Sequence, residues 1–382
     1  MLLTAVGLAA ALGYAHTLEQ RYIHALAPEL HAAKLLGVEL QRLAFAQPDL
    51  LVLYGSSELA KEMPNNPREF FNDYPTDFRV FPVGKPGSTS LTTLEKLAAV
   101  GKDLQGRKVA FSISPGWFFT EVFDPKYYEG NFSEIQAAQF IYSCHLSRPL
   151  RRDIARRMIE YPRTLDSRPF LEFVLDRLAG DTPLDHFLYT LAWPLGKVYS
   201  GIAQVQDHLE VAIHIMDEDE SLSDQPRRVT RHVAWNDVLK RAVRFASKGA
   251  VQAKRNEVAR RHLPRASRDR TFRQTMAKAK EWTDFELLLR VMKELDAQPL
   301  LLSMPIEDIR LEVYGISPEI RTAYHQRLNG LASQYGFPLL DFHEYQNDPS
   351  FMVDFLDHLS GSGWLYYNKA LDDFFHGRTP KS

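Results

Sequence analysis

Two polar stretches near opposite ends of the sequence carry residue types that could together transfer an acyl group. Residues 50–54 are five consecutive apolar or aromatic residues, and Gly55, Ser56, Ser57 and Glu58 follow directly. A glycine at the end of a strand allows a sharp turn, and ligands of open α/β sheets bind beyond the carboxyl ends of strands. A serine at such a turn can act as a nucleophile if a general base lies within hydrogen-bond reach.

His358 is the predicted base, because acidic residues precede it and a Ser-Gly-Ser-Gly-Trp segment follows it closely. A neutral imidazole can take the hydroxyl proton and return it to a leaving group. A carboxylate must then hold the imidazole in the correct tautomer. We predict Asp354 for this role, since residues four apart meet on a helical turn. Asp357 remains the alternative, although adjacent side chains of an extended segment point apart.

Alternating segments of two types would position these groups. Strands are predicted at residues 50–54, 78–83, 108–113, 300–304 and 338–342, with helical segments among them. This alternation predicts an α/β fold in three layers, a parallel sheet flanked by helices. Between residues 133 and 281 the strands stop, which predicts a large helical insertion. Residues 18–45 are predicted to form one helix, because leucines recur at helical spacing.

Five stretches occur in the order and spacing of one known family: Gly55–Leu59, Val83–Leu91, Ser112–Phe118, Pro299–Pro305 and His358–Trp364. They resemble the sequence blocks of the DltD family, the D-alanyl transfer proteins of cell-envelope teichoic acids, which are relatives of the SGNH/GDSL hydrolases. Two positions depart from the family pattern. Gly116 stands where the family usually has Gln, and the family's Asp-x-x-His spacing would need an aspartate where Phe355 stands.

The resemblance implies an SGNH-hydrolase-like fold and selects Ser57 over Ser56 as the nucleophile. It also implies an oxyanion hole formed by the backbone N–H groups of Ser57 and Gly87. The third donor of SGNH hydrolases, an Asn, is missing near Gly116, and losing one such donor typically costs about 3 kcal/mol. Slow hydrolysis would suit a transferase, because an acyl-serine must survive until its acceptor arrives. Nearby aromatic residues could line the pocket or belong to the core: Trp117, Phe118, Phe119 and Trp364.

As function, the resemblance implies D-alanyl transfer to an anionic envelope polymer. The acyl group would come through a membrane O-acyltransferase, and originally from a D-alanyl carrier protein. An N-terminal membrane anchor, which we place at residues 1–18, would precede one extracytoplasmic domain at residues 19–382. The apolar run is shorter than the roughly 20 residues of a full span, so a signal peptide or a buried helix remains open. No metal and no organic cofactor are expected, because this chemistry uses side chains only.

Composition is that of a soluble globular protein, and a formal net charge of −2 predicts no overall attraction to nucleic acid. The single cysteine, Cys144, excludes an intramolecular disulfide. Residues 227–280 contain 17 Lys and Arg against 3 Asp and Glu, a net of +14. This segment is either a set of exposed helical faces or a surface for anionic headgroups or an anionic polymer.

Two other functions remain open. An SGNH-type O-acyltransferase or esterase could act on an exopolysaccharide with the same side chains. A non-catalytic module could instead bind the carrier protein or the polymer through the basic segment, and the irregular aspartate spacing and the missing Asn favour this reading slightly. A fluorophosphonate probe would separate the enzyme from the binding module, because it labels only an activated serine.

Overall fold

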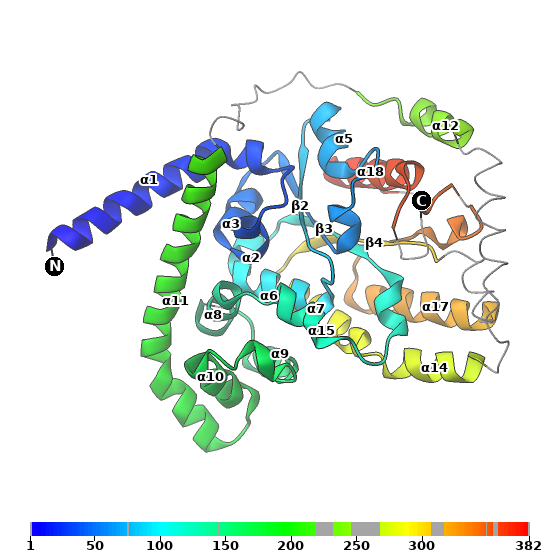
Figure 1. Ribbon diagram of the computed structural model, residues 1–382. Helices are drawn as coiled ribbons and strands as arrows, with labels where there is room; N and C mark the ends of the chain where they lie inside the picture. Colours follow the sequence, from blue (N-terminus) through cyan, green and yellow to red (C-terminus); the bar gives the residue numbers. More distant parts are fainter. Residues whose placement is uncertain are drawn as a thin grey trace.

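A five-stranded parallel sheet forms the centre of the molecule, in the order β2-β1-β3-β4-β5 (Figure 1). The computed structural model describes residues 2–74, 76–143, 145–218, 232–245, 268–306, 317–348, 350–353 and 358–380. The strands are β1 (Leu50–Gly55), β2 (Arg79–Gly84), β3 (Lys108–Ile113), β4 (Gln298–Ser303) and β5 (Leu339–Asp341). The predicted α/β class and its five strands are confirmed, and no strand boundary is displaced by more than two residues.

The side chains of β1 alternate between two hydrophobic cores, one on each face of the sheet. Val52 and Tyr54 belong to one core, and Leu51 and Leu53 belong to the other. The first core includes α6 (Ser90–Val100), α8 (Glu134–Ser143) and α15 (Lys280–Glu294), and the second includes α5 (Pro67–Asp73) and α18 (Gly361–Phe375). A strand buried on both faces favours apolar side chains throughout, and the one hydroxyl in residues 50–54, that of Tyr54, donates to Oε1 of Gln41 at 2.7 Å.

Helices fill most of the described chain between β3 and β4. Besides α8 and α15 they are α7 (Pro125–Asn131), α9 (Arg148–Met158), α10 (Pro169–Ala179), α11 (Pro183–Glu218), α12 (Trp235–Phe245) and α14 (Arg268–Lys278). A further helix, α17 (Pro318–Tyr335), precedes β5. Much of the basic segment at residues 227–280 lies outside the described residues.

The prediction of one helix over residues 18–45 is wrong. The structure has three helices there: α1 (Leu2–Leu26), α2 (Ala32–Leu36) and α3 (Glu39–Ala46). Pro28 cannot donate a backbone hydrogen bond and clashes with the preceding turn, so α1 ends before it. The buried Lys34 ammonium donates to the carbonyls of Ala27 and Glu29, both at 2.7 Å. Asp207 of α11 stabilises the start of α3 by accepting two backbone N–H groups at 2.7 and 2.9 Å.

The first half of α1 projects away from the body of the molecule, and its second half packs along α11 (Figure 1). Within the part of the chain that the structure describes, no helix is both long enough and apolar enough to cross a membrane. The anchor predicted at residues 1–18 therefore stays a prediction.

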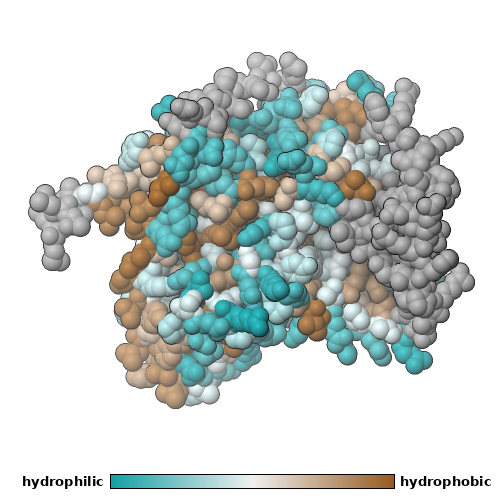
Figure 2. All heavy atoms as spheres, viewed as in Figure 1, coloured by the Kyte–Doolittle hydropathy of each residue, from teal (hydrophilic) through white to brown (hydrophobic). Residues whose placement is uncertain are grey.

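The outer face of α11 carries a line of exposed apolar side chains. Those at its amino-terminal half are each at least 60% exposed and recur every three or four residues: Leu184, Phe187, Leu191, Leu195, Val198 and Ile202. This spacing places them on one side of the helix. Figure 2 shows hydrophobic surface along the side of the molecule that α1 and α11 form. An apolar face of this length on the outside of a protein indicates an interaction surface.

Candidate active site

The carboxyl end of β1 holds the two serines at the edge of the sheet where all five strands end. Ser56 follows the strand, and Ser57 is the first residue of α4 (Ser57–Ala60). The Oγ atom of Ser57 lies 2.9 Å from Nε2 of His358, which is hydrogen-bonding distance. The structure therefore brings the predicted nucleophile and the predicted base together, and it makes this contact through Ser57.

Main-chain contacts on both sides hold His358 in place. Met352 and Leu359 form an antiparallel bridge, and the N–H of Val353 donates to the carbonyl of His358 at 2.9 Å. Ser360 then caps α18, since its Oγ accepts two backbone N–H groups at 3.1 Å each. His358 thus lies three residues before the start of α18, a helix that packs in the second core.

Asp354, the predicted orienting carboxylate, and its alternative Asp357 both lie outside the described residues. The role of Asp354 and the oxyanion role of the Ser57 N–H group stay predictions.

Glu58 is a buried carboxylate close to His358, and it was not predicted as a site residue. Its side chain is only 2% exposed, and its Oε1 accepts the backbone N–H of Ser56 at 2.9 Å. Burial raises the pKa of Glu58, while the hydrogen bond from Ser56 and the nearby His358 imidazole act in the opposite direction. The sequence signal that could have identified Glu58 is its position directly after the two serines at the end of a buried strand and before the apolar Leu59.

Close backbone packing under the site requires two glycines. Gly55 and Gly84 are register partners at the ends of β1 and β2. A Cβ atom on Gly84 would lie 2.9 Å from the carbonyl oxygen of Gly55 and 2.8 Å from the side chain of Leu59. A larger residue would therefore push β2 away from the strand that carries Ser57.

The turn that contains Gly87 follows β2 at the same edge of the sheet. The φ angle of Gly87 is +84°, in the left-handed region that favours glycine, and a Cβ atom there would lie 2.6 Å from Tyr127 of α7. Asn131, also on α7, donates to the carbonyl of Pro86 at 3.1 Å and accepts from the Ser88 hydroxyl at 3.0 Å. Asn131 therefore fixes the turn, a role that was not predicted from its sequence context. The oxyanion role of Gly87 stays a prediction.

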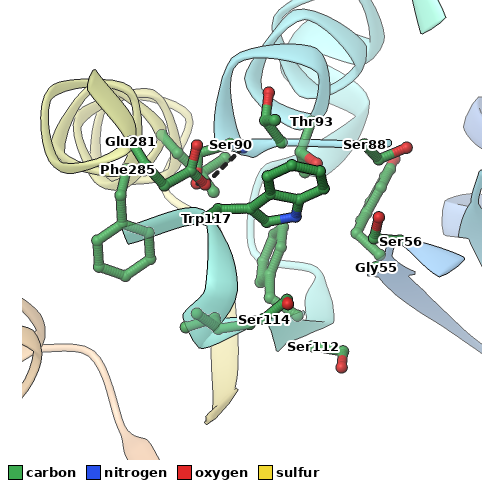
Figure 3. A pocket seen from close by; sticks show the side chains of 15 residues that line it. Gly55, Ser56, Ser88, Ser90, Thr93, Ser112, Ser114, Trp117, Glu281 and Phe285 are labelled. Atoms are coloured by element: carbon green, nitrogen blue, oxygen red, sulfur yellow. Dashed lines mark hydrogen bonds between the residues drawn. The ribbon is translucent and has the colours of Figure 1, made fainter. Parts of the chain in front are cut away.

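A small pocket lies beside Ser56 (Figure 3). Its lining includes Gly55, Ser56, Ser88, Ser114, Trp117 and Glu281. The volume is about 30 Å³, which suits one small chemical group or one to two water molecules. Of the aromatic residues considered from the sequence, Trp117 lines this pocket, whereas Phe118 and Trp364 are fully buried in the two cores.

Glu281, in the first turn of α15, is the carboxylate of this pocket. It is 3% exposed, and its Oε1 accepts the backbone N–H of Ser90 at 2.9 Å and the Ser90 hydroxyl at 2.6 Å. Burial, with a smaller contribution from Asp284, raises the pKa of Glu281 to about 8. Sequence analysis missed this residue, because nothing in the local pattern of α15 separates it from a solvent-exposed glutamate.

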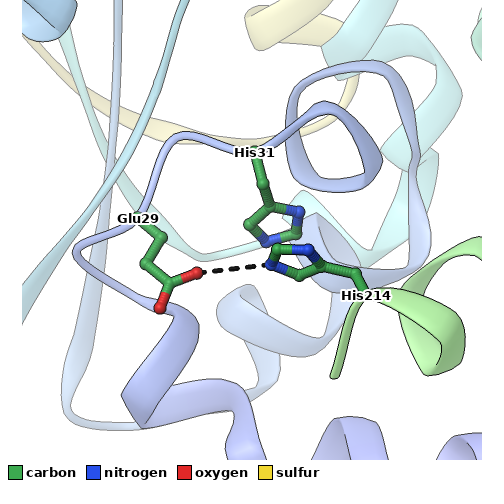
Figure 4. A group of neighbouring side chains, drawn as sticks. All are labelled: Glu29, His31 and His214. Carbon is green, nitrogen blue, oxygen red and sulfur yellow. Dashed lines mark hydrogen bonds and ion pairs between the residues drawn. The ribbon is translucent and has the colours of Figure 1, made fainter. Parts of the chain in front are cut away.

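A cluster of Glu29, His31 and His214 offers three potential metal ligands away from this edge (Figure 4). The two imidazole rings are stacked, with centroids 3.9 Å apart and planes inclined by 19°, so their in-plane lone pairs do not converge on one ion. The Nδ1 atom of His31 already accepts the N–H of Lys34, and burial, then His214, lowers the pKa of His31 to about 3. His214 Nε2 lies 3.4 Å from the Glu29 carboxylate. These contacts indicate a structural role, in which they hold α11 against the connection from α1 to α2.

The sheet, its helical layers and a serine–histidine contact at the carboxyl edge define a three-layer α/β protein with an SGNH-like fold. The family model described as DltD protein matches residues 27–376, so the chain belongs to the DltD family. Protein DltD of Bacillus subtilis (strain 168) is 25% identical over 357 residues, covering 91% of this chain and 88% of the relative. Protein DltD of Staphylococcus aureus is 22% identical, with coverage of 85% and 81%, and that of Lacticaseibacillus rhamnosus is 24% identical, with coverage of 93% and 84%.

These similarities confirm the family resemblance found from the sequence motifs. They place the chain among proteins involved in the D-alanylation of teichoic acids.

Proposed function

We propose that this protein is a serine-dependent acyltransferase that passes a D-alanyl group to a hydroxyl of an anionic envelope polymer. The observation that carries the proposal is the 2.9 Å contact between Ser57 Oγ and His358 Nε2. In a member of the DltD family, an alcohol and an imidazole in this arrangement fit the chemistry that D-alanylation needs. The small pocket beside Ser56, the residue before the nucleophile, fits a short acyl group better than a long one.

The proposed reaction has two balanced halves. Ser57 Oγ attacks the carbonyl carbon of a D-alanyl thioester or ester, and His358 Nε2 accepts the hydroxyl proton. The bond to the donor's sulfur or oxygen then breaks, and His358 returns the proton to that leaving atom. In the second half the acceptor hydroxyl gives its proton to His358 and attacks the D-alanyl–Ser57 ester, and the released Ser57 oxygen takes the proton back.

Three further groups assist in this mechanism. The backbone N–H groups of Ser57 and Gly87 donate to the oxyanion of each tetrahedral intermediate. Asp354 accepts from Nδ1 of His358 and keeps Nε2 free to receive the serine proton. The mechanism uses side chains and backbone only, without a metal or an organic cofactor.

The site would work on the extracytoplasmic face of the cell membrane. A membrane O-acyltransferase would supply the acyl group, which a D-alanyl carrier protein first holds as a thioester. Two surfaces support a position at the membrane: the apolar first half of α1 and the exposed apolar face of α11. We propose that the face of α11 rests in the outer part of the lipid bilayer, because it combines length, exposure and few charges.

A fluorophosphonate labelling experiment tests the proposal directly. The purified full-length chain is treated with the probe, and the modified residue is located by mass spectrometry. Labelling at Ser57, lost in Ser57→Ala and strongly reduced in His358→Gln, supports an acyl-transfer site. Folded protein without any labelling would support a non-catalytic binding module instead.

Acyl transfer or ester hydrolysis on an exopolysaccharide is the second candidate, because a pocket of this size also accepts an acetyl group. The mass of an acyl adduct trapped on Ser57 decides between the two. A D-alanyl adduct supports the first proposal, and an acetyl adduct supports the second.

A further inference from the structure

The pocket that Ser56 lines, one residue before Ser57, contains several buried polar atoms without a protein partner. Within the described residues, Ser56 Oγ, Trp117 Nε1 and Glu281 Oε2 are buried and accept or donate no hydrogen bond. All three residues line the same pocket. An unsatisfied buried polar group costs about 1–3 kcal/mol, so such atoms gathered around one small pocket indicate a polar ligand.

Glu281 divides its two carboxylate oxygens between two tasks. Its Oε1 holds the start of α6 through two hydrogen bonds from Ser90, while Oε2 has no such structural contact. Figure 3 shows the Glu281 carboxylate on one side of the Trp117 indole and Ser56 on the other. If Glu281 served only to cap α6, a neutral side chain with one acceptor oxygen would be sufficient.

The guanidinium of Arg157, whose charge acts on Glu281, is already engaged in other ion pairs. Arg157 forms a bidentate pair with Asp284, with distances of 2.7 and 3.0 Å, and it also contacts Glu160. Asp284 is itself negative and lies close enough to disfavour the ionised form of Glu281. A positively charged ligand would therefore find in Glu281 a carboxylate oxygen to which no described side chain of the protein donates.

We propose that Glu281 binds the α-ammonium group of the aminoacyl substrate, with the face of the Trp117 indole as a second contact for the cation. This inference rests on the proposed acyl transfer at Ser57 and names the feature by which the site selects its acyl group. The chemistry follows from the ligand: an α-aminoacyl ester carries a cation two bonds from the carbonyl carbon that Ser57 attacks. An acetyl group has no such cation and gains nothing from a carboxylate.

The raised pKa of Glu281 fits this role. Without ligand the carboxyl group is mostly protonated at neutral pH, because its pKa is about 8. An ammonium group beside Oε2 favours the ionised form, so binding releases the proton and creates a buried ion pair.

Two covalent serine probes provide the test: diphenyl 1-aminoethylphosphonate and its amine-free analogue diphenyl ethylphosphonate. Both phosphonylate an activated serine oxygen and release phenol. Intact-mass spectrometry measures the second-order rate of each probe on the full-length protein. Glu281→Gln keeps an acceptor for Ser90, and Glu286→Gln removes a carboxylate on the same helix that contacts Tyr335 instead of the pocket.

The wild-type protein and Glu286→Gln should react at least about tenfold faster with the amino probe than with its analogue, as expected for a hydrogen bond between charged groups. Glu281→Gln should lose this preference, because its rate with the amino probe falls at least about tenfold more than its rate with diphenyl ethylphosphonate. An unchanged preference in Glu281→Gln, or equal loss with both probes, would overturn the inference.

A binding measurement separates this inference from the proposed function. Isothermal titration calorimetry compares the affinities of D-alaninamide and of its hydroxyl analogue, D-lactamide. Each ligand is titrated into the Ser57→Ala variant and into the Ser57→Ala/Glu281→Gln variant. Binding of D-alaninamide that depends on Glu281 supports the ammonium site even if neither probe labels Ser57. Absence of labelling would then reject the proposed acyl transfer but not the ammonium site. Absence of any Glu281-dependent preference in titration rejects the ammonium site, whatever the labelling shows.

Discussion

Ser57 and His358 are 301 positions apart in the sequence, yet Ser57 Oγ and His358 Nε2 are 2.9 Å apart in the folded protein. The contact arises because Ser57 follows the carboxyl end of β1, while His358 leads into a helix that packs in the core beneath the same edge. Serine is a weak nucleophile without such a partner. The pair is therefore the feature on which the proposed chemistry depends.

Replacing the base should slow acylation without unfolding the protein. A general base typically contributes about 10²–10⁴ in rate, so His358→Gln should lower the rate of Ser57 phosphonylation by that factor. Far-ultraviolet circular dichroism checks the fold. His343→Gln, at a half-exposed histidine beyond β5, is the matched control and should label at the wild-type rate. Equal rates for His358→Gln and the wild type would show that the imidazole does not activate Ser57.

The strands and the nearness of Ser57 to His358 could be predicted, because each follows from local patterns and from the common edge of a parallel sheet. Glu281 and Asn131 could not be predicted. Their positions depend on how α15 and α7 pack against α6 and against the turn at Gly87, which no local pattern encodes. The helix break before Pro28 could have been predicted from the proline itself. It was not predicted because the leucine periodicity continues on both sides of the proline and concealed the interruption.

Gly87→Ala should destabilise the protein for two separable reasons. A non-glycine residue at φ +84° is strained by about 1–3 kcal/mol, and the new Cβ would contact Tyr127. Urea unfolding should show a lower free energy of unfolding for Gly87→Ala. The double variant Gly87→Ala/Tyr127→Ala removes the contact but keeps the strain. The loss of stability caused by Gly87→Ala should therefore be smaller in the Tyr127→Ala background than in the wild type. If the two backgrounds lose the same amount, Tyr127 does not restrict this turn.

Glu281 should make stability depend on pH in a defined window. Its pKa is about 8 in the folded protein against an ordinary value of 4.5, so the folded state retains a proton that the unfolded state has lost between these values. The free energy of unfolding contributed by Glu281 is therefore fully present below pH 4.5 and is lost as pH rises through 8. The slope is at most about 1.4 kcal/mol per pH unit.

Glu281→Gln removes this titration while keeping the acceptor for Ser90. Its stability relative to the wild type should increase as the pH is raised from 5 to 9, measured by urea unfolding at each pH. Glu95 and Asp207, whose pKa values burial raises to about 7, titrate in both proteins and cancel in the difference. A difference that does not change with pH would show that Glu281 is already ionised in the folded protein.

The exposed face of α11 should bind lipid. Two glutamates in its centre, Leu191→Glu and Leu195→Glu, place charges where we propose that acyl chains lie. Transfer of a leucine side chain from water is worth about 1.5–3 kcal/mol, so partitioning onto phosphatidylcholine vesicles should fall at least about tenfold in a flotation assay. The control, Thr190→Glu/Phe173→Glu, adds the same charge at exposed positions off this face and should float like the wild type. Equal flotation of both variants would show that membrane binding depends on α1 alone. If flotation is unchanged but the variant no longer binds a membrane O-acyltransferase, the face of α11 is a binding surface for that protein instead of for lipid.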